Sequence, residues 1–96
     1  MDISFNKKDG ELTVAIDGRL DTITAPALES FLGSHYEGTV SLTFDCEKLI
    51  YISSAGLRVL LTAHKRMKGA MKLFGVNELV MEVLEMTGFA DVWEIV

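Results

Sequence analysis

The chain has 96 residues, of which 49% are hydrophobic and 24% are charged, and it carries a net charge of −5 at pH 7. This length predicts one domain, residues 1–96, with one hydrophobic core. The negative charge argues against nucleic-acid binding, because phosphate groups would be repelled. The only basic cluster, Lys65, Arg66 and Lys68, is explained by compensation of a helix dipole.

The sequence also argues against a membrane or secreted protein. No apolar run approaches the roughly 20 residues that cross a bilayer, and residues 1–9 lack the basic and apolar segments of a secretory signal. We therefore expect a cytoplasmic protein. The single cysteine, Cys46, has no disulfide partner in the chain, and its strand-like surroundings predict a half-buried thiol rather than a redox centre.

The first part of the chain predicts a β-hairpin followed by a helix. Apolar and polar residues alternate over residues 3–6 and 12–17, with a Lys-Lys-Asp-Gly turn between the two runs. The helix is expected to begin near Pro26 with Thr24 as its N-cap, and to end at Gly33. Its predicted core-facing residues are Leu28, Phe31 and Leu32.

From residue 39 onward, strand and helix patterns continue to alternate. Strands are expected at residues 39–46, 71–76 and 92–96. Helices are expected from the pair Ser53-Ser54 to Gly69 and from Asn77 to Gly88. The residues expected to face the core are Val40, Leu42, Phe44 and Cys46 on the first of these strands, Leu57, Leu60, Leu61 and His64 on the first helix, and Val80, Val83, Leu84 and Met86 on the second.

The expected order of elements is therefore β-β-α-β-α-β-α-β. Strands that are separated by helices pair in parallel through right-handed crossovers, and the initial hairpin adds an antiparallel pair. The sequence thus predicts an α/β fold, a single mixed sheet of four to five strands with about three helices packed on it.

Nucleophilic catalysis by Ser54 is not favoured by the residues around it. A catalytic serine needs a base, and the two histidines are explained otherwise, His35 as a solvated loop residue and His64 as a packing residue. Residues 52–56 lack the first glycine of a G-x-S-x-G elbow. The chain also offers no metal-ligand pair and no phosphate-binding glycine loop. We expect no enzyme active site, metal or cofactor.

Two adjacent hydroxyl groups, those of Ser53 and Ser54, stand where an apolar strand end meets a predicted helix N-terminus. Capping of the helix by either serine is the simpler interpretation. The same position also tolerates a phosphoryl group, because unpaired N–H donors and the positive end of the helix dipole favour an anion. A phosphate would add about −1.5 to −2 charges to an acidic surface and act as a local electrostatic switch.

Two segments resemble the signature motifs of STAS domains, the sulphate-transporter and anti-sigma-factor-antagonist domains. Residues 45–61, DCEKLIYISSAGLRVLL, align without a gap to the pattern D-L-S-x-V-x-Y-I-D-S-S-G-L-x-x-L-L. Residues 18–25, GRLDTITA, resemble the second pattern, G-x-L-D-x-x-T-A. The resemblance covers nearly the whole chain, and it implies that Ser54 is the serine phosphorylated by a partner kinase.

The resemblance implies a partner-switching mechanism. The unphosphorylated protein would bind an anti-sigma factor serine kinase and thereby free a sigma factor, whereas phosphorylation of Ser54 would break the complex and a PP2C-type phosphatase would reset it. ATP would bind the kinase, so this chain would be a substrate and not an enzyme. Asp21 would shape the kinase-facing surface. The residues implied in partner binding are Asp21, Thr24, Ser53, Ser54, Ala55 and Gly56.

Three departures from the family pattern qualify this transfer. Ser53 stands where many members carry aspartate and can compete as phosphoacceptor, whereas Ala55 replaces a common serine or threonine and so favours Ser54. The chain ends at Val96, where many members continue into a further helix, so the edge that this helix would cover is expected to be either open or used by a partner. The fold also occurs in transporter tails and in lipid-transport assemblies, and the alternative is therefore a scaffold subunit of a lipid-transport ATPase assembly in which Ser54 is never modified.

Overall fold

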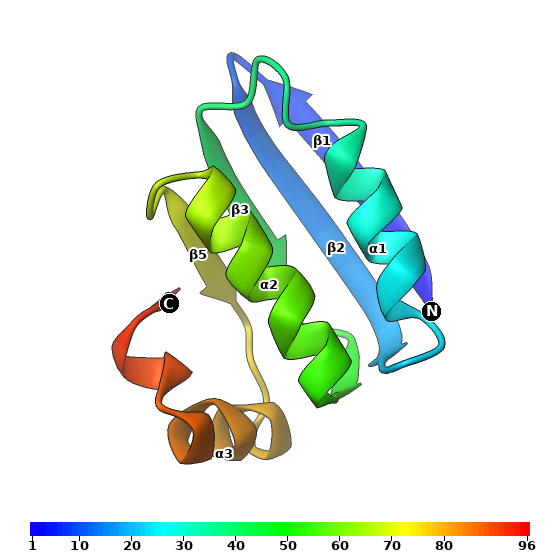
Figure 1. Ribbon diagram of the computed structural model, residues 1–96, viewed down its shortest axis with the longest axis vertical. Helices are drawn as coiled ribbons and strands as arrows, with labels where there is room; N and C mark the ends of the chain where they lie inside the picture. Colours follow the sequence, from blue (N-terminus) through cyan, green and yellow to red (C-terminus); the bar gives the residue numbers. More distant parts are fainter.

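The computed structural model describes all 96 residues, which form six strands, three α-helices and one 3-10 helix (Figure 1). The strands are β1 (Asp2–Lys8), β2 (Glu11–Leu20), β3 (Ser41–Asp45), β4 (Leu49–Ile52), β5 (Met71–Phe74) and β6 (Glu94–Ile95). The helices are α1 (Ala25–Gly33), α2 (Ser54–Arg66), α3 (Glu78–Thr87) and the 3-10 helix η1 (Phe89–Asp91). The predicted fold class is confirmed.

The sheet has the order β1-β2-β3-β5-β6, with β4 paired to β2 outside this path. Only β1 and β2 are antiparallel, and the other pairs are parallel, as the helical crossovers require. The long strand β2 pairs with β3 over Glu11–Ala15 and with β4 over Gly18–Leu20. The register shifts just after Gly18, whose φ of +108° is a conformation that glycine adopts without strain.

Strand β4 is the one element that the sequence did not predict as a separate strand. It is only 4 residues long, and its burial does not alternate, since Leu49 and Ile52 are buried while Ile50 is exposed. Only two residues, Glu47 and Lys48, separate Cys46 from Leu49, and the Leu49 N–H donates to the Cys46 carbonyl across this tight turn at 3.1 Å. The element matters because it carries the chain to the start of α2.

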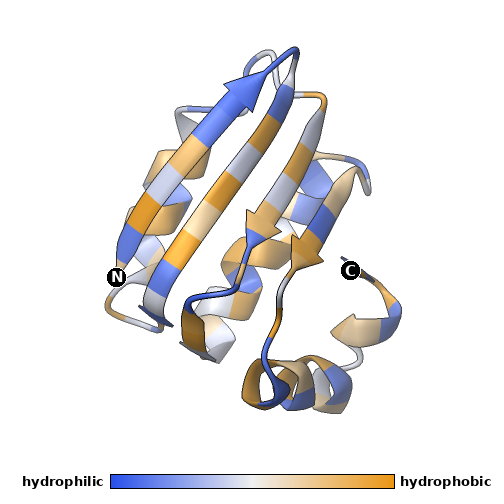
Figure 2. Ribbon diagram, turned by 180° about the vertical axis from the view of Figure 1, so that it is seen from behind, coloured by the Kyte–Doolittle hydropathy of each residue, from blue (hydrophilic) through white to orange (hydrophobic).

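Helices cover only one face of the sheet. Figure 1 shows α1 and α2 side by side in front of the strands, while α3 lies beyond the end of β5. The buried face of β2 presents Leu12, Val14 and Ile16 to these helices, in the predicted alternation. Figure 2 shows the sheet from the reverse side, which no helix covers, and hydrophilic and hydrophobic residues alternate along β1 and β2, as expected for strands with one buried face.

Three expectations about which residues belong to the core were wrong. Val40 is 67% exposed because β3 begins only at Ser41, two residues after the predicted start, so Val40 lies before the strand. Met86 is 86% exposed because α3 packs through Val80 and Leu84, whose spacing of four residues places Met86 on another side of the helix. Cys46 is fully buried rather than half-buried, since the chain turns only after it.

Helix α3 is fixed to β4 through its N-cap residue, Asn77. The Asn77 side chain accepts a hydrogen bond from the Val80 N–H at 2.8 Å, as predicted for an N-cap, and its amide donates to the Leu49 carbonyl at 2.9 Å. Gly88, with φ of +84°, ends the helix as predicted. The strand predicted at residues 92–96 is shorter than expected, because the chain leaves η1 only at Asp91 and β6 spans Glu94–Ile95. None of the helices has the length and hydrophobicity that a membrane span requires.

Candidate functional site at the N-terminus of α2

The pairing of β2 with β4 brings the two sequence motifs together. Leu20 is opposite Ile52 in parallel register, and the Ser53 N–H donates to the Leu20 carbonyl at 2.9 Å. The carboxyl ends of parallel strands lie at the same edge of a sheet, where α/β proteins form their sites. The loop that begins at Asp21 and the helix that begins at Ser54 therefore start next to one another.

Gly56 allows the first turn of α2 to approach these strands closely. A Cβ atom at this position would lie 2.8 Å from Leu20 Cγ and 2.9 Å from Ile52 Cγ1, closer than carbon atoms pack. The predicted partner-binding residue Gly56 is buried, so its role in the fold is to seat the helix.

The two serines have different roles in the structure. Ser53 is the N-cap of α2, with its hydroxyl oxygen 3.5 Å from the Gly56 nitrogen that donates to it, which is a long and weak hydrogen bond. Ser54 is the first helical residue, its side chain is exposed, and its hydroxyl makes no hydrogen bond within the chain. The first turn of α2 contains no acidic residue, so the positive end of its dipole is uncompensated.

Asp21 organises the loop between β2 and α1. Its Oδ1 accepts hydrogen bonds from the Ile23 N–H at 3.0 Å and the Thr24 N–H at 3.1 Å. These bonds, the one from Thr24 first, hold the pKa of the Asp21 carboxyl below its ordinary value, with help from the Thr24 hydroxyl and Arg19 and against the effect of burial. The carboxylate is therefore charged at neutral pH, and its Oδ1 accepts hydrogen bonds from backbone N–H groups of its own loop.

Thr24 occupies the N-cap position of α1, as predicted, but its side chain does not cap the helix. Its hydroxyl donates to the Arg19 carbonyl at 2.8 Å and accepts from the Asp21 N–H at 2.9 Å. A threonine hydroxyl that is turned back into the loop cannot reach the first helical N–H groups. Thr24 thus stabilises the loop that lies beside the N-terminus of α2.

A cation over an aromatic ring adjoins this loop and was not predicted from the sequence. The Arg19 guanidinium lies 4.2 Å from the centre of the Tyr51 ring, and its Nε lies 3.7 Å from Asp21 Oδ2. Arg19 and Tyr51 are opposite one another in the β2–β4 register. Only knowledge of that register could have revealed the pair, because β4 was not recognised as a strand.

A shallow groove of about 150 Å³ runs between the beginnings of α1 and α2. Ala55, one of the predicted partner-binding residues, lines it next to Ser54. The remaining lining residues are Thr22, Ala25, Pro26, Glu29, Arg58 and Val59. Arg58 and Glu29 bring opposite charges into the groove, and neither residue was singled out in the sequence.

Neither histidine is placed to act as a base for Ser54. His64 lies about 15 Å further along the axis of the same helix. His35 follows the far end of α1, where its ring stacks on Phe31 with centroids 4.1 Å apart and its Nδ1 lies 2.7 Å from the Phe31 carbonyl oxygen. The expectation of a solvated His35 was therefore wrong, because an aromatic cluster that includes Phe5 covers it.

The Cys46 thiol is not a reactive group. Burial, with a smaller effect from the nearby Asp45 carboxylate, raises the pKa of the thiol to about 12. The thiol is therefore protonated at neutral pH, which makes it a poor nucleophile.

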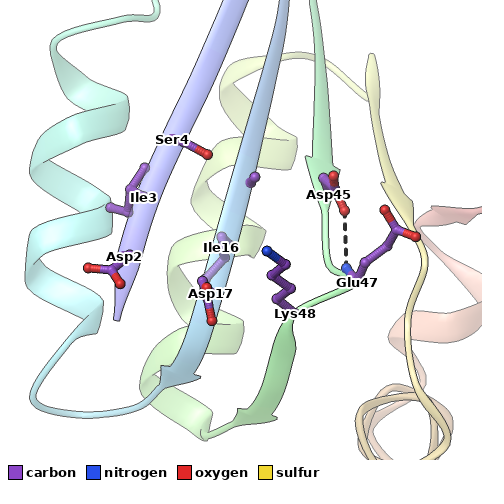
Figure 3. A pocket seen from close by; sticks show the side chains of 9 residues that line it. Asp2, Ile3, Ser4, Ile16, Asp17, Asp45, Glu47 and Lys48 are labelled. Atoms are coloured by element: carbon purple, nitrogen blue, oxygen red, sulfur yellow. Dashed lines mark hydrogen bonds between the residues drawn. The ribbon is translucent and has the colours of Figure 1, made fainter.

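The uncovered face of the sheet contains a separate cavity of about 220 Å³. Figure 3 shows Asp2, Asp17 and Asp45 on three neighbouring strands around it, with the Glu47 N–H donating to Asp45 Oδ1 at 3.1 Å. The acidic groups do not gather into a set that could hold a metal ion. None of the predicted site residues lines this cavity.

Comparisons with known proteins place this architecture in a family. A family model described as "STAS domain" matches residues 2–96. BtrV of Bordetella bronchiseptica, to which an anti-sigma factor antagonist role is ascribed, is 32% identical over an alignment that covers 99% of this chain and 85% of BtrV. The anti-sigma-B factor antagonist of Listeria monocytogenes is 30% identical, with 99% of this chain and 90% of the relative covered.

Solved structures share the fold. An anti-sigma factor antagonist from Mycobacterium paratuberculosis has a TM-score of 0.87 at 21% identity, over 98% of this chain and 83% of that one. The anti-sigma factor antagonist SpoIIAA in its unphosphorylated form has a TM-score of 0.78 at 11% identity, over 99% and 87%. Phosphorylated SpoIIAA from Bacillus has a TM-score of 0.75 at 11% identity, over 99% and 91%. From the family model and the two relatives, the chain belongs to the STAS domain family.

Proposed function

We propose that this protein is an anti-sigma factor antagonist that acts by partner switching, with Ser54 as its phosphorylated residue. It binds an anti-sigma factor kinase while the Ser54 hydroxyl is unmodified, and it is released when Ser54 is phosphorylated. The observation that carries the proposal is the exposed Ser54 hydroxyl at the first position of α2, unbonded because Ser53 serves as the cap. The names of the relatives BtrV and the Listeria antagonist agree with it.

In the proposed reaction this chain is a substrate. The kinase transfers the γ-phosphoryl group of ATP to Ser54 Oγ, so that the Oγ–P bond forms, the bond to ADP breaks and the hydroxyl proton leaves. A PP2C-type phosphatase would reverse the modification by hydrolysis, in which water takes the phosphoryl group and the serine is restored. ATP binds the kinase in this scheme.

The phosphate would act through charge and not through unfolding. It would add about −1.5 to −2 charges to a chain whose net charge is already −5. The first N–H groups of α2 and the uncompensated dipole tolerate this charge, so the fold is retained while an approaching acidic surface is repelled. Asp21 and Thr24 hold the adjoining loop in place, and Ala55 belongs to the neighbouring groove.

Site-resolved mass spectrometry of the protein from its native host, under growth and under stress, tests the modification. We expect phosphate on Ser54 with an occupancy that changes between the two conditions. Ser53 is the internal control, because its hydroxyl is half-buried at the cap. Phosphate on Ser53 alone, or on neither serine under any condition, would contradict the assignment.

Partner capture separates the switch from a constitutive scaffold. We expect Ser54→Ala to retain an ATP-binding anti-sigma factor and Ser54→Asp to lose it. The matched control is Thr62→Asp, which adds the same charge at an exposed position two turns further along α2. Equal recovery of a transport ATPase by both Ser54 variants would instead support the scaffold subunit of a lipid-transport assembly.

A further inference from the structure

Arg58 lies one helical turn after Ser54 on the same side of α2. Residues that are four apart in an α-helix are neighbours, separated by about 6 Å along the axis and about 40° around it. Both side chains are exposed. The order is also the favourable one, since an acidic group at position i with a basic group at position i+4 agrees with the helix dipole.

The Arg58 guanidinium has no ionic partner in the unmodified chain. The only ion pair of the structure joins Arg19 and Asp21. Arg58 contributes instead to the groove between α1 and α2, where Glu29 also lies without pairing with it. Arg58 is therefore a cation beside Ser54 that no other group holds.

Arg19 and the basic residues in the last turn of α2 are poorly placed to reach Ser54. Arg19 is held by the Tyr51 ring and by Asp21. Lys65 and Arg66 lie at the far end of α2, about 16–18 Å along the helix axis from Ser54 and so beyond the screening length of about 8 Å at physiological salt. The negative groups nearby are Asp21 in the adjoining loop and Glu29 on α1.

We propose that Arg58 is the internal counter-ion of phosphorylated Ser54, and that modification draws its guanidinium out of the groove and onto the phosphate. This inference rests on the proposed phosphorylation of Ser54. A planar guanidinium binds phosphate oxygens through two parallel N–H bonds, which an ammonium group does not provide. Arg58 thus positions the phosphate after modification and takes no part in its transfer.

The movement changes the charge of the groove as well as that of Ser54. Glu29 and Arg58 are the only charged residues that line the groove in the unmodified chain. When Arg58 turns to the phosphate, Glu29 is left as the remaining charge there. Phosphorylation would therefore make the groove negative at a distance from the phosphate itself, and a partner that approaches both places would be repelled by both.

The test uses the full-length protein with phosphoserine incorporated at position 54 by genetic encoding, so that no kinase is needed. Phosphorus NMR would follow the second ionisation of the phosphate in this protein and in the Arg58→Ala, Arg58→Lys and Arg66→Ala variants. We expect Arg58→Ala to raise the proton affinity of the phosphate about threefold to tenfold, and Arg58→Lys to raise it less. Arg66→Ala removes the same charge from the far end of the helix and should change nothing.

A second readout follows the guanidinium directly. The Arg58 Nε–H signal in nitrogen-15 NMR should shift when Ser54 is replaced by phosphoserine, and the Arg66 signal should stay in place. An unchanged Arg58 signal, or equal effects of Arg58→Ala and Arg66→Ala on the phosphate, would overturn the inference. Because the phosphate is installed without a kinase, these results are independent of whether the host modifies Ser54.

Discussion

The N-termini of α2 and α3 both begin with a polar N-cap residue, but the hydrogen bond that caps α3 is much shorter than the one that caps α2. At α3, Asn77 accepts a cap bond of 2.8 Å, its amide ties the helix to β4, and Glu78 supplies a negative charge in the first turn. At α2, the cap bond from Gly56 to Ser53 is 3.5 Å long and no acidic residue follows. The positive end of the α3 dipole is therefore compensated by a negative charge, whereas that of α2 is not.

The α3 terminus is a structural helix end, whereas the α2 terminus is available for modification. A cap residue and a hydroxyl in the next position are present in many ordinary helices. The distinguishing features at α2 are an exposed hydroxyl without a partner and a first turn without an acid. The α2 terminus is instead fixed by packing, since Gly56 lets it lie directly on Leu20 and Ile52.

The largest effect is therefore expected from Gly56→Ala. Alanine in a helix is ordinarily favoured over glycine by about 1 kcal/mol, but here the added methyl group meets Leu20 and Ile52 side-chain carbons at 2.8 and 2.9 Å. We expect a loss of about 2–3 kcal/mol in the free energy of unfolding, measured by urea denaturation. Gly33→Ala, in the last turn of α1 with nothing within 4 Å, is the matched control and should be neutral or stabilising.

The next largest effect is a difference between the N-caps of α3 and α2 in their contribution to the free energy of unfolding. Asn77→Ala removes the bond to Val80 and the tie to Leu49, and should lower the free energy of unfolding by about 1.5–2 kcal/mol. Ser53→Ala removes only a long bond, and about 0.5 kcal/mol is expected. Paired denaturation curves measure both, and equal losses would mean that the bond lengths at the two helix ends do not reflect their strength.

The loop at the start of α1 adds a pH dependence. The Asp21 pKa is held below the reference value of 3.8 in the folded chain, so the carboxylate stabilises the fold above that value. The contribution is lost as the pH falls through the lower folded pKa. Thermal unfolding between pH 6 and pH 2 should show a shallower acid limb for Asp21→Asn than for the parent, and Asp17→Asn, exposed on β2, is the control.

Much of this arrangement could be predicted from the sequence, because each prediction depended on local chemistry. Alternation placed β2, helical spacing placed Leu57 and Leu60 in the core, and Asn77 and Gly88 marked the ends of α3. The pairing of motifs from two distant segments could be expected only through the resemblance to the STAS family.

The rest depended on register, which periodicity does not give. Strand β4 was missed, and with it the contact between Arg19 and Tyr51. The sequence could not tell which serine caps α2, because the answer depends on the extended conformation of Ser53. The spacing of Arg58 from Ser54 is visible in the sequence, but only the structure shows that Arg58 has no ionic partner.

The smallest effect tests the comparison most directly, because it adds or removes one charge at equivalent positions. Ser54→Asp places a carboxylate at the first residue of α2, and should raise the free energy of unfolding by about 0.5 kcal/mol at low ionic strength. Glu78→Gln removes the carboxylate at the first residue of α3 and should lower it by a similar amount. Thr62→Asp, exposed in α2, lies outside the first turn and gains nothing from the helix N-terminus, so any gain there measures the pairing with Arg66 four residues on.

Both changes should shrink in about 1 M salt, where the screening length falls to about 3 Å. Urea denaturation at the two salt concentrations measures them, and m-values should be unchanged because the folded surface is the same. If Ser54→Asp destabilises the chain at low salt while Glu78→Gln also does, the α2 terminus does not accept an anion, and the physical basis for a phosphate at Ser54 is removed. If the two respond in opposite directions, α2 accepts at Ser54 the kind of charge that α3 already has at Glu78.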